Sequence, residues 1–207
     1  AVPDAGYTFD GWYSDAGYDH LLSNEETFEF VPAGPLRHIY PVFMPGEIQL
    51  DALNTANCYI APELLRDYSF DATVQGNGCA TLNITPQRLS GAYARLVWET
   101  GTQANSVISS LGYDGSRIRF RTGTQQGNAL IGLFNAGGEC VWSWHIWVAN
   151  YDPESSAQKY SSGDIFMDRN LGTVGTDYTK VTACGLYYQW GRKDPFPHPA
   201  SFTNNAR

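Results

Sequence analysis

The chain has 207 residues and is acidic, with 13 Lys and Arg against 21 Asp and Glu and a formal net charge of -8. This charge argues against a nucleic acid or an anionic membrane surface as the main partner, because both attract dense positive charge. Aromatic residues make up 14% of the chain and charged residues only 16%, which favours short strands and turns over long helices. No apolar run reaches the ~18 residues of a membrane span, so no transmembrane segment is predicted.

The first predicted module spans residues 1–46 and consists of short strands. One strand runs from residue 7 into a turn at 14–17, and two more are expected at 27–31 and 38–43. The runs Tyr-Thr-Phe-Asp-Gly-Trp-Tyr-Ser-Asp and Ile-Tyr-Pro-Val-Phe resemble the Listeria–Bacteroides extracellular repeat, a small β-grasp-like module of surface proteins. The match lacks the strand that should precede Gly6, so we expect a repeat truncated at its N-terminus.

The second predicted module spans residues 47–150 and begins after Pro45-Gly46, with a connector of some strand character. Short strands then recur at regular intervals between Gly, Asn, Pro and Ser residues, which predicts an immunoglobulin-like sandwich of two sheets. The last two strands, joined by Ala-Gly-Gly, form its central hairpin. A short helix is expected only at 61–67. The predicted strands are 57–61, 68–70, 95–98, 107–111, 117–121, 128–135 and 140–148.

The last of these strands carries three tryptophans and a histidine. Alternation places Trp142 and Trp144 on one face, and His145 and Trp147 on the other. Aromatic faces stack on sugar rings, so the cluster is one candidate glycan platform. Anchoring of the sandwich core is the favoured interpretation, because large rings in mid-sandwich strands bury most of their area. We expect His145 to be a hydrogen-bonded structural residue, because no carboxylate or second histidine lies nearby in the sequence.

The four cysteines, at positions 58, 79, 140 and 184, are irregularly spaced and form no Cys-x-x-Cys motif. This spacing disfavours a zinc site. Two of them, Cys58 and Cys140, lie in apolar strands, where a free thiol behaves as a small hydrophobe. Buried free thiols are therefore predicted, with one disulfide as the alternative.

Two charged groups of residues are also candidates for binding. Arg117, Arg119 and Arg121 share one strand face. That face either receives a sulfated or sialylated glycan or, as we favour, pairs with the surplus Asp and Glu. Four acids offer oxygens for calcium, but the Asp-x-Asp-x-Asp-Gly loop is absent, so no metal and no cofactor are predicted. These acids are Asp152, Glu154, Asp164 and Asp168.

The third predicted module spans residues 151–207. Trp-Ser-Trp-His-Ile-Trp-Val, Met-Asp-Arg-Asn-Leu-Gly and Leu-Tyr-Tyr-Gln-Trp-Gly-Arg-Lys-Asp-Pro-Phe together resemble Bacteroidetes surface and fimbrial-tip proteins of the fimbrillin type. The last two motifs resemble the Fibrobacter succinogenes major paralogous domain, a distant relative of the C-type-lectin-like fold. The resemblance implies a mainly β chain that ends in the start of a lectin-like α+β domain, and a location at the cell surface, outer-membrane anchored or fimbrial.

Four residues of the last motif are the candidate ligand-binding residues: Tyr188, Trp190, Arg192 and Asp194. They combine aromatic rings with polar and charged groups, as a sugar site requires. The alternative is a structural turn, because Asp-Pro favours a turn and Arg192 can pair with Asp194 across it.

No catalytic motif is present. The chain lacks Gly-x-Ser-x-Gly, His-Glu-x-x-His, a Walker loop and a dinucleotide fingerprint, so no catalytic residue is predicted. We expect a non-enzymatic adhesin or fimbrial-tip-like protein that binds a glycan or protein ligand on a host or neighbouring cell, with other pilus subunits as further partners. The alternatives are a structural stalk or pilus-assembly module, and a glycan-active enzyme, which needs only two suitably spaced carboxylates.

Overall fold

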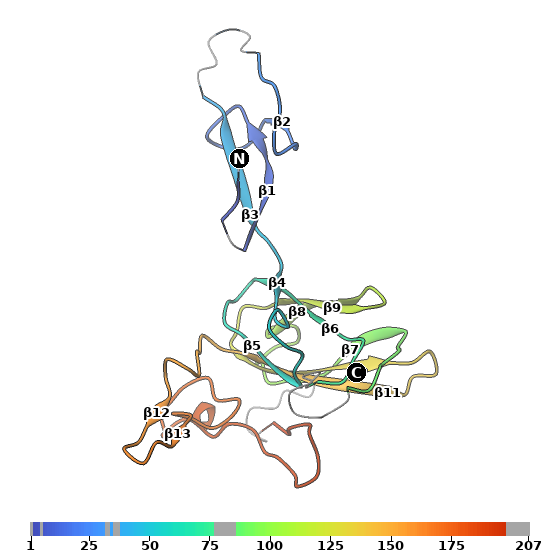
Figure 1. Ribbon diagram of the computed structural model, residues 1–207, viewed down its shortest axis with the longest axis vertical. Helices are drawn as coiled ribbons and strands as arrows, with labels where there is room; N and C mark the ends of the chain where they lie inside the picture. The colour runs from blue at the N-terminus through green and yellow to red at the C-terminus, as the bar shows by residue number, and fades with distance from the viewer. Residues whose placement is uncertain (1, 5, 32–33, 35–37, 77–85, 198–207) are drawn as a thin grey trace. The chain divides into compact units, whose positions relative to one another are not determined.

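The protein is mainly β, as expected from its composition. The computed structural model describes residues 2–4, 6–31, 34, 38–76 and 86–197 (Figure 1). The chain divides into two compact units, Ala1–Ile48 and Gln49–Arg207. Within the described residues the helical element is η2, a 3-10 turn at Val181–Ala183, and no helix there is long and apolar enough to cross a membrane.

The first unit is a three-stranded antiparallel sheet. Its order is β2-β1-β3, with β1 at Tyr7–Tyr13, β2 at Leu21–Ser23 and β3 at Tyr40–Pro45. A Cβ at Gly11 would lie 2.9 Å from the Ser23 backbone oxygen, so glycine lets the β2 backbone approach β1 this closely.

The aromatic residues of this unit contact one another at its surface. Trp12 lies between Phe9 and Phe28, with ring centroids 5.6 and 5.8 Å away. None of the described hydrophobic side chains before residue 49 is buried. The predicted strand at 27–31 is wrong, because Phe28 joins this ring cluster from backbone that pairs with no strand.

The second unit contains two four-stranded sheets. One has the order β5-β11-β10-β7, in which β5 runs parallel to β11 and the other pairs are antiparallel. The other has the order β4-β6-β9-β8. A two-stranded sheet, β12-β13, follows them in the chain. The strands are β4 Ile48–Gln49, β5 Cys58–Ala61, β6 Asp67–Asp71, β7 Tyr93–Glu99, β8 Ile108–Tyr113, β9 Arg117–Thr122, β10 Gly127–Phe134, β11 Cys140–Val148, β12 Gln158–Lys159 and β13 Ile165–Phe166.

The predicted central hairpin is confirmed, since β10 and β11 are the two inner strands of their sheet. Their connection is closed by Asn135, whose Oδ1 accepts hydrogen bonds from the backbone N–H groups of Gly137 and Glu139. Gly138 has φ +85°, a conformation that favours glycine.

The core of the sandwich is aromatic and is contributed by both sheets. Trp144 of β11 is fully buried, and its ring lies 5.2 Å from that of Phe70 on β6. Phe70 also stacks on Tyr59 of β5 at 5.0 Å. The rings of Tyr68 and Phe120 stack at 5.5 Å on the other sheet. Offset and edge contacts of this kind add to the stabilisation that burial provides, so the core interpretation of Trp144 is confirmed.

Every residue of β10 is buried, as are residues 143–148 of β11. Successive strand residues point to opposite faces of a sheet, so a strand buried at every position must be covered on both sides. The inner face packs against the other sheet. The outer face is covered by chain segments that follow β11, and it is on this face that the candidate site lies.

Two predictions for the second unit are wrong. Residues 61–67 form no helix, because Leu65 has φ 54°, a left-handed conformation that interrupts a right-handed helix. Cys58, Cys140 and Cys184 are free, as predicted, but exposed rather than buried. Cys58 and Cys140 are the first residues of their strands, where fewer neighbouring segments cover the side chains. Cys79 lies outside the described residues.

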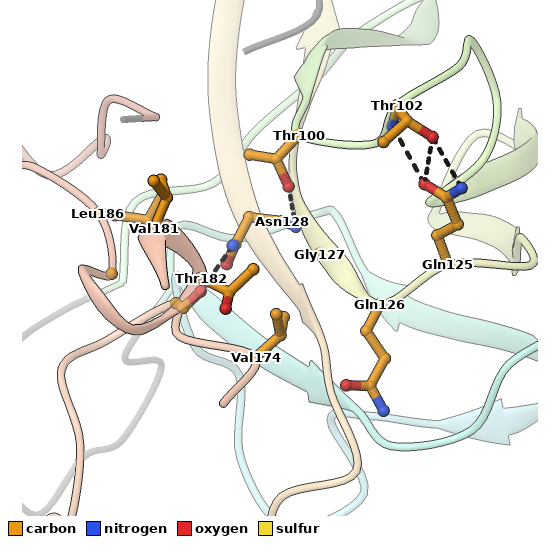
Figure 2. Close-up of a pocket in the computed structure, with 12 residues that line it drawn as sticks. Thr100, Thr102, Gln125, Gln126, Gly127, Asn128, Val174, Val181, Thr182 and Leu186 are labelled. Atoms are coloured by element: carbon orange, nitrogen blue, oxygen red, sulfur yellow. Dashed lines mark hydrogen bonds between the residues drawn. The ribbon is translucent and has the colours of Figure 1, made fainter. Parts of the chain in front are cut away.

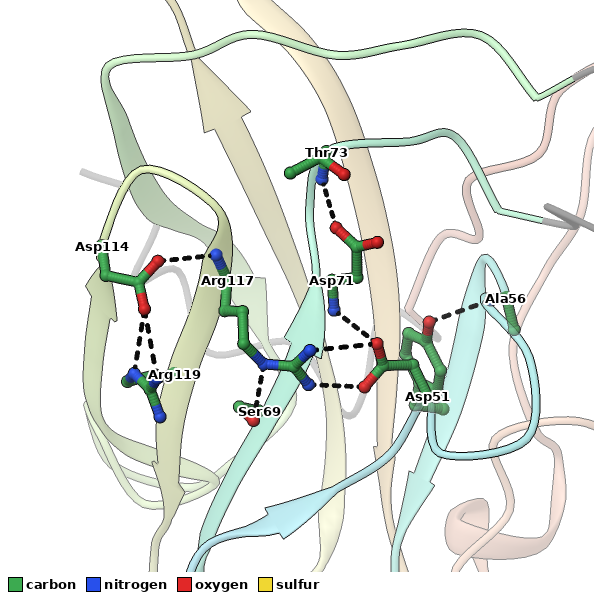
Figure 3. Close-up of polar contacts among 9 residues, drawn as sticks. Asp51, Ala56, Ser69, Asp71, Thr73, Asp114, Arg117 and Arg119 are labelled. Atoms are coloured by element: carbon green, nitrogen blue, oxygen red, sulfur yellow. Dashed lines mark hydrogen bonds and ion pairs between the residues drawn. The ribbon is translucent and has the colours of Figure 1, made fainter.

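The arginine stripe on β9 pairs with acids, which confirms the favoured interpretation. Arg117 makes two hydrogen bonds to the Asp51 carboxylate, and Arg119 pairs with Asp114 at 3.1 Å (Figure 3). Arg121 pairs with Asp67 at 2.6 Å. The stripe is therefore held by the protein's own carboxylates.

We expect Asp114 to make stability depend on acid pH. Hydrogen bonds from the backbone N–H groups of Arg117 and Ser116, followed by those from the Ser116 hydroxyl and Arg119, lower the pKa of this carboxyl. A pKa lowered by folding contributes stability above the unfolded-state pKa of about 3.9, and this contribution is lost as the pH falls through the folded-state pKa. Asp114→Asn should therefore reduce the loss of stability that occurs as the pH falls below about 4, measured by urea unfolding. An unchanged loss, equal to that of a Glu154→Gln control, would contradict this.

Candidate functional site

Residues after 150 cover the outer face of the β5-β11-β10-β7 sheet. The Trp147 indole donates from Nε1 to the Thr173 carbonyl at 3.1 Å, and Asn128 donates from Nδ2 to the Gly172 carbonyl at 2.7 Å. Trp147 is only 1% exposed and packs with Tyr151 in a second small core. The sugar-platform hypothesis is thus wrong for Trp144 and Trp147, because neither ring is open to solvent.

The predicted site residues lie on a closed loop at residues 187–196. Tyr187 and Phe196 exchange two backbone hydrogen bonds of 2.8 Å, which join the two ends of the loop. At its tip the Arg192 N–H donates to the Gln189 carbonyl at 3.0 Å, and Gly191 has φ +80°. The tip is a tight turn that requires glycine at this position.

One side of the loop is anchored to the outer face of the sheet through Ser143 of β11. The Ser143 hydroxyl donates to the Asp194 carboxylate, with contacts of 2.8 and 2.9 Å to its two oxygens. Lys193 Nζ lies 2.8 Å from the Ser143 carbonyl oxygen, forms an ion pair with Asp194 and sits 4.3 Å from the Trp142 ring centroid. This network of charge-assisted hydrogen bonds fixes the loop to a buried strand.

The structure separates the four predicted site residues into two roles. Trp190 is 100% exposed, and Tyr188 is 46% exposed. Arg192 is exposed too, with its guanidinium carbon 4.5 Å from the Phe196 ring centroid. Asp194 is bound to the sheet and its ion-pair partner is Lys193 rather than Arg192. Trp190, Arg192 and Tyr188 are therefore available to a ligand, whereas Asp194 holds the loop in place.

An apolar cavity of about 410 Å³ lies between this loop and the sheet. Trp98 and Leu130, which are paired across β7 and β10, contribute its floor, and Arg192 is its polar group. No sequence pattern singled out Trp98, because only the packing of the 187–196 loop on the sheet brings it beside these residues. The cavity is lined by Val97, Trp98, Leu130, Arg192, Pro195, Phe196 and Pro197.

A second cavity, of about 160 Å³, lies at the start of β10 (Figure 2). Four of its polar residues, Thr100, Thr102, Gln125 and Asn128, already bond to one another or to nearby backbone. Gln125 makes contacts of 2.8 to 3.0 Å with Thr102, and the Thr100 hydroxyl oxygen accepts from the Asn128 N–H at 2.9 Å. This cavity is therefore a junction between chain segments, with few hydrogen-bonding groups left for a ligand.

The acids that were considered for calcium do not converge. Asp168 is paired with the adjacent Arg169 through two hydrogen bonds of 2.8 Å, and Arg169 also lies over the Tyr151 ring at 4.1 Å. Across residues 2–197, leaving aside the undescribed positions, no group of three or more His, Cys, Asp and Glu side chains is arranged to hold a metal ion.

Comparisons with known proteins add no precedent for this arrangement. No protein-family model matches the chain, and neither the curated proteins nor the solved structures gave a significant match. What the chain does must therefore be inferred from its own residues.

Proposed function

We propose that this chain is a non-enzymatic cell-surface binding protein, of the adhesin or fimbrial-tip type, and that the 187–196 loop contacts its glycan or protein ligand. The observation that carries the proposal is the position of Trp190, whose side chain is fully exposed at the tip of a loop with fixed ends. A glycan is the ligand that we favour, because an exposed indole presents its face to the apolar face of a sugar ring while Arg192 supplies hydrogen-bond donors beside it.

The physical support is the combination of exposure and rigidity. Water contact with a whole indole is unfavourable, since burial of apolar surface yields roughly 25 cal/mol per Å². A ligand that covers Trp190 recovers this free energy. Because Ser143, Lys193 and Asp194 already hold the loop, little conformational entropy is lost on binding. Exposed Trp and Arg side chains are also the residues that most often dominate binding energy.

We also propose a fold for each of the three modules of the chain. In this proposal the first unit is the end of a β-grasp-like extracellular repeat, the sandwich is immunoglobulin-like, and residues after 150 are the start of a C-type-lectin-like domain. The motifs that resemble fimbrillin-type proteins support it, together with the mainly β architecture. The protein would then act at the cell surface, anchored in the outer membrane or assembled into a fimbria.

The test is binding of the purified chain to an array of glycans and mucins, with Trp190→Ala beside the wild type. We expect saturable binding and a loss of at least about 2 kcal/mol, roughly thirtyfold in Kd, in the variant. Arg192→Ala should weaken binding to the same ligands.

Tyr178→Ala is the matched control, because Tyr178 is also an almost fully exposed aromatic residue, at 92%, but lies outside the loop. Its binding should equal that of the wild type. Equal loss in both variants would show nonspecific adsorption to exposed rings. Absence of glycan binding by the folded wild type would overturn the glycan ligand and leave a stalk or pilus-assembly module as the better account.

A further inference from the structure

Three side chains from neighbouring strands form a row on the outer face of the β5-β11-β10-β7 sheet. The parallel register of β5 and β11 pairs Cys58 with His145, and Cys58 Sγ lies 3.1 Å from His145 Nδ1. The other ring nitrogen, Nε2, lies 2.9 Å from Asn128 Oδ1 on β10. A thiol, an imidazole and a carboxamide are thus in consecutive hydrogen-bond contact.

The hydrogen bonds determine which ring nitrogen carries the proton. Asn128 donates from Nδ2 to the Gly172 carbonyl at 2.7 Å, so the oxygen of its amide must face His145. Since that oxygen only accepts, His145 donates from Nε2. Burial lowers the pKa of His145 to about 4, which keeps the ring neutral. Nδ1 therefore carries no proton, and its lone pair accepts the hydrogen bond that the Cys58 thiol donates.

Cys58 is the member of the row that solvent reaches. It is exposed, whereas His145 and Asn128 are only 3% and 5% exposed. We propose that Cys58 is a nucleophile that accepts an acyl group from an ester in one covalent step without turnover, with His145 as its general base and Asn128 as the residue that positions the imidazole. A nucleophile bonded to a base that a third group orients is the arrangement that activates thiols and hydroxyls on unrelated folds.

The reaction starts from a neutral thiol. As Sγ attacks the carbonyl carbon of the ester, the C–S bond forms and the thiol proton moves to His145 Nδ1. The C–O bond then breaks, and Nδ1 returns the proton to the departing oxygen. The products are a thioester on Cys58 and an alcohol, with no oxidant or reductant required.

The surroundings of the pair select the class of substrate. Desolvation raises the pKa of the Cys58 thiol even though the residue keeps exposed surface, and burial disfavours the imidazolium form of His145. A standing thiolate is therefore absent at neutral pH, and the base is weak. The thiol must therefore pass its proton to His145 Nδ1 as it attacks, and an ester with a good leaving group is the suitable substrate.

The probe is p-nitrophenyl acetate, applied to the 207-residue chain at neutral pH. Acetylated cysteines are located and timed by peptide mass spectrometry. Cys140 and Cys184 are internal controls, because both are exposed free thiols, and Cys140 Sγ contacts the Trp142 carbonyl oxygen in place of an imidazole. We expect Cys58 to be acetylated faster than either control, because only Cys58 can pass its proton to an imidazole as it attacks. Equal rates at the three thiols would overturn the proposal.

The variant His145→Gln tests whether fast acylation of Cys58 depends on the imidazole or only on exposure of the thiol to solvent. Glutamine keeps an N–H that reaches Asn128 but has no acceptor in the Nδ1 position. The rate at Cys58 should fall roughly 100-fold while the rates at Cys140 and Cys184 stay the same. If this variant does not fold, the solvent deuterium isotope effect on the wild-type rate decides. A value above one supports proton transfer to a base, and a value of one overturns it.

Asn128→Asp tests the positioning role. A carboxylate at Nε2 should raise the pKa of His145, so the acid limb of the rate–pH profile at Cys58 should move to higher pH. An unmoved limb in the folded variant would mean that Asn128 has only a structural role. Other titratable or charged groups on this side of the sheet include Tyr188, which senses charge on Cys58, the Lys193–Asp194 pair at Ser143, and Arg192. None of them is altered by the substitution.

Discussion

Trp144→Ala should lower the free energy of unfolding by roughly 3–5 kcal/mol. Trp144 is completely buried, with a relative exposure of 0%. Its ring centroid lies 5.2 Å from that of Phe70 on the opposite sheet. Removal of the indole takes away its burial and leaves a void between the two sheets that the surrounding strands cannot fully close. Urea unfolding followed by circular dichroism measures the loss.

Trp190→Ala is the matched control for that experiment, because it deletes the same side chain from a fully exposed position. We expect its stability to stay within about 0.5 kcal/mol of the wild type. The pair of variants therefore separates the two roles of tryptophan in this chain. A large loss of stability in Trp190→Ala, or a small one in Trp144→Ala, would contradict the assignment of core and surface.

Glu99→Gln should lower the free energy of unfolding by roughly 2–3 kcal/mol. Glu99 has 0% exposure, and one of its oxygens accepts from the backbone N–H groups of Val107 and Ile108 at 3.1 and 3.0 Å. The other oxygen accepts from the Asn105 N–H. Glutamine offers one oxygen in place of two, and its amide NH₂ group would face a backbone donor, so at least one buried N–H loses its acceptor.

Thermal or urea unfolding at neutral pH measures this effect, with Glu139→Gln as the control. Glu139 is exposed and its carboxylate binds only the Asn135 side chain at the hairpin connection, so we expect a change within about 0.5 kcal/mol. Equal stability of Glu99→Gln and the wild type would show that the buried carboxylate does not hold the 100–107 segment. Proteolysis within that segment gives an independent readout, since loss of the carboxylate contacts should expose it.

The sequence by itself predicted the β class, the central hairpin and most strand positions. Alternation of apolar residues, glycine-containing turns and the regular spacing of short strands are local signals, and each acts over fewer than ten residues. The same kind of signal identified the 187–196 loop, because rings, charges and Asp-Pro occur there together. Local patterns gave wrong predictions at two places. The strand expected at 27–31 is absent, and Phe28 contacts the Trp12 ring instead. The helix expected at 61–67 is absent because Leu65 has a left-handed conformation.

The tertiary structure decided which side chains share a site. Cys58, Asn128 and His145 are up to 87 positions apart, and only the pairing of β5, β11 and β10 puts them in a row. Likewise, Asp194 reaches Ser143 and Trp98 reaches the 187–196 loop through contacts between distant segments. Strand pairing and burial depend on the free energy of the whole fold, so no local pattern carries them. The chemistry that depends on those contacts was therefore hidden until the sheets were assembled.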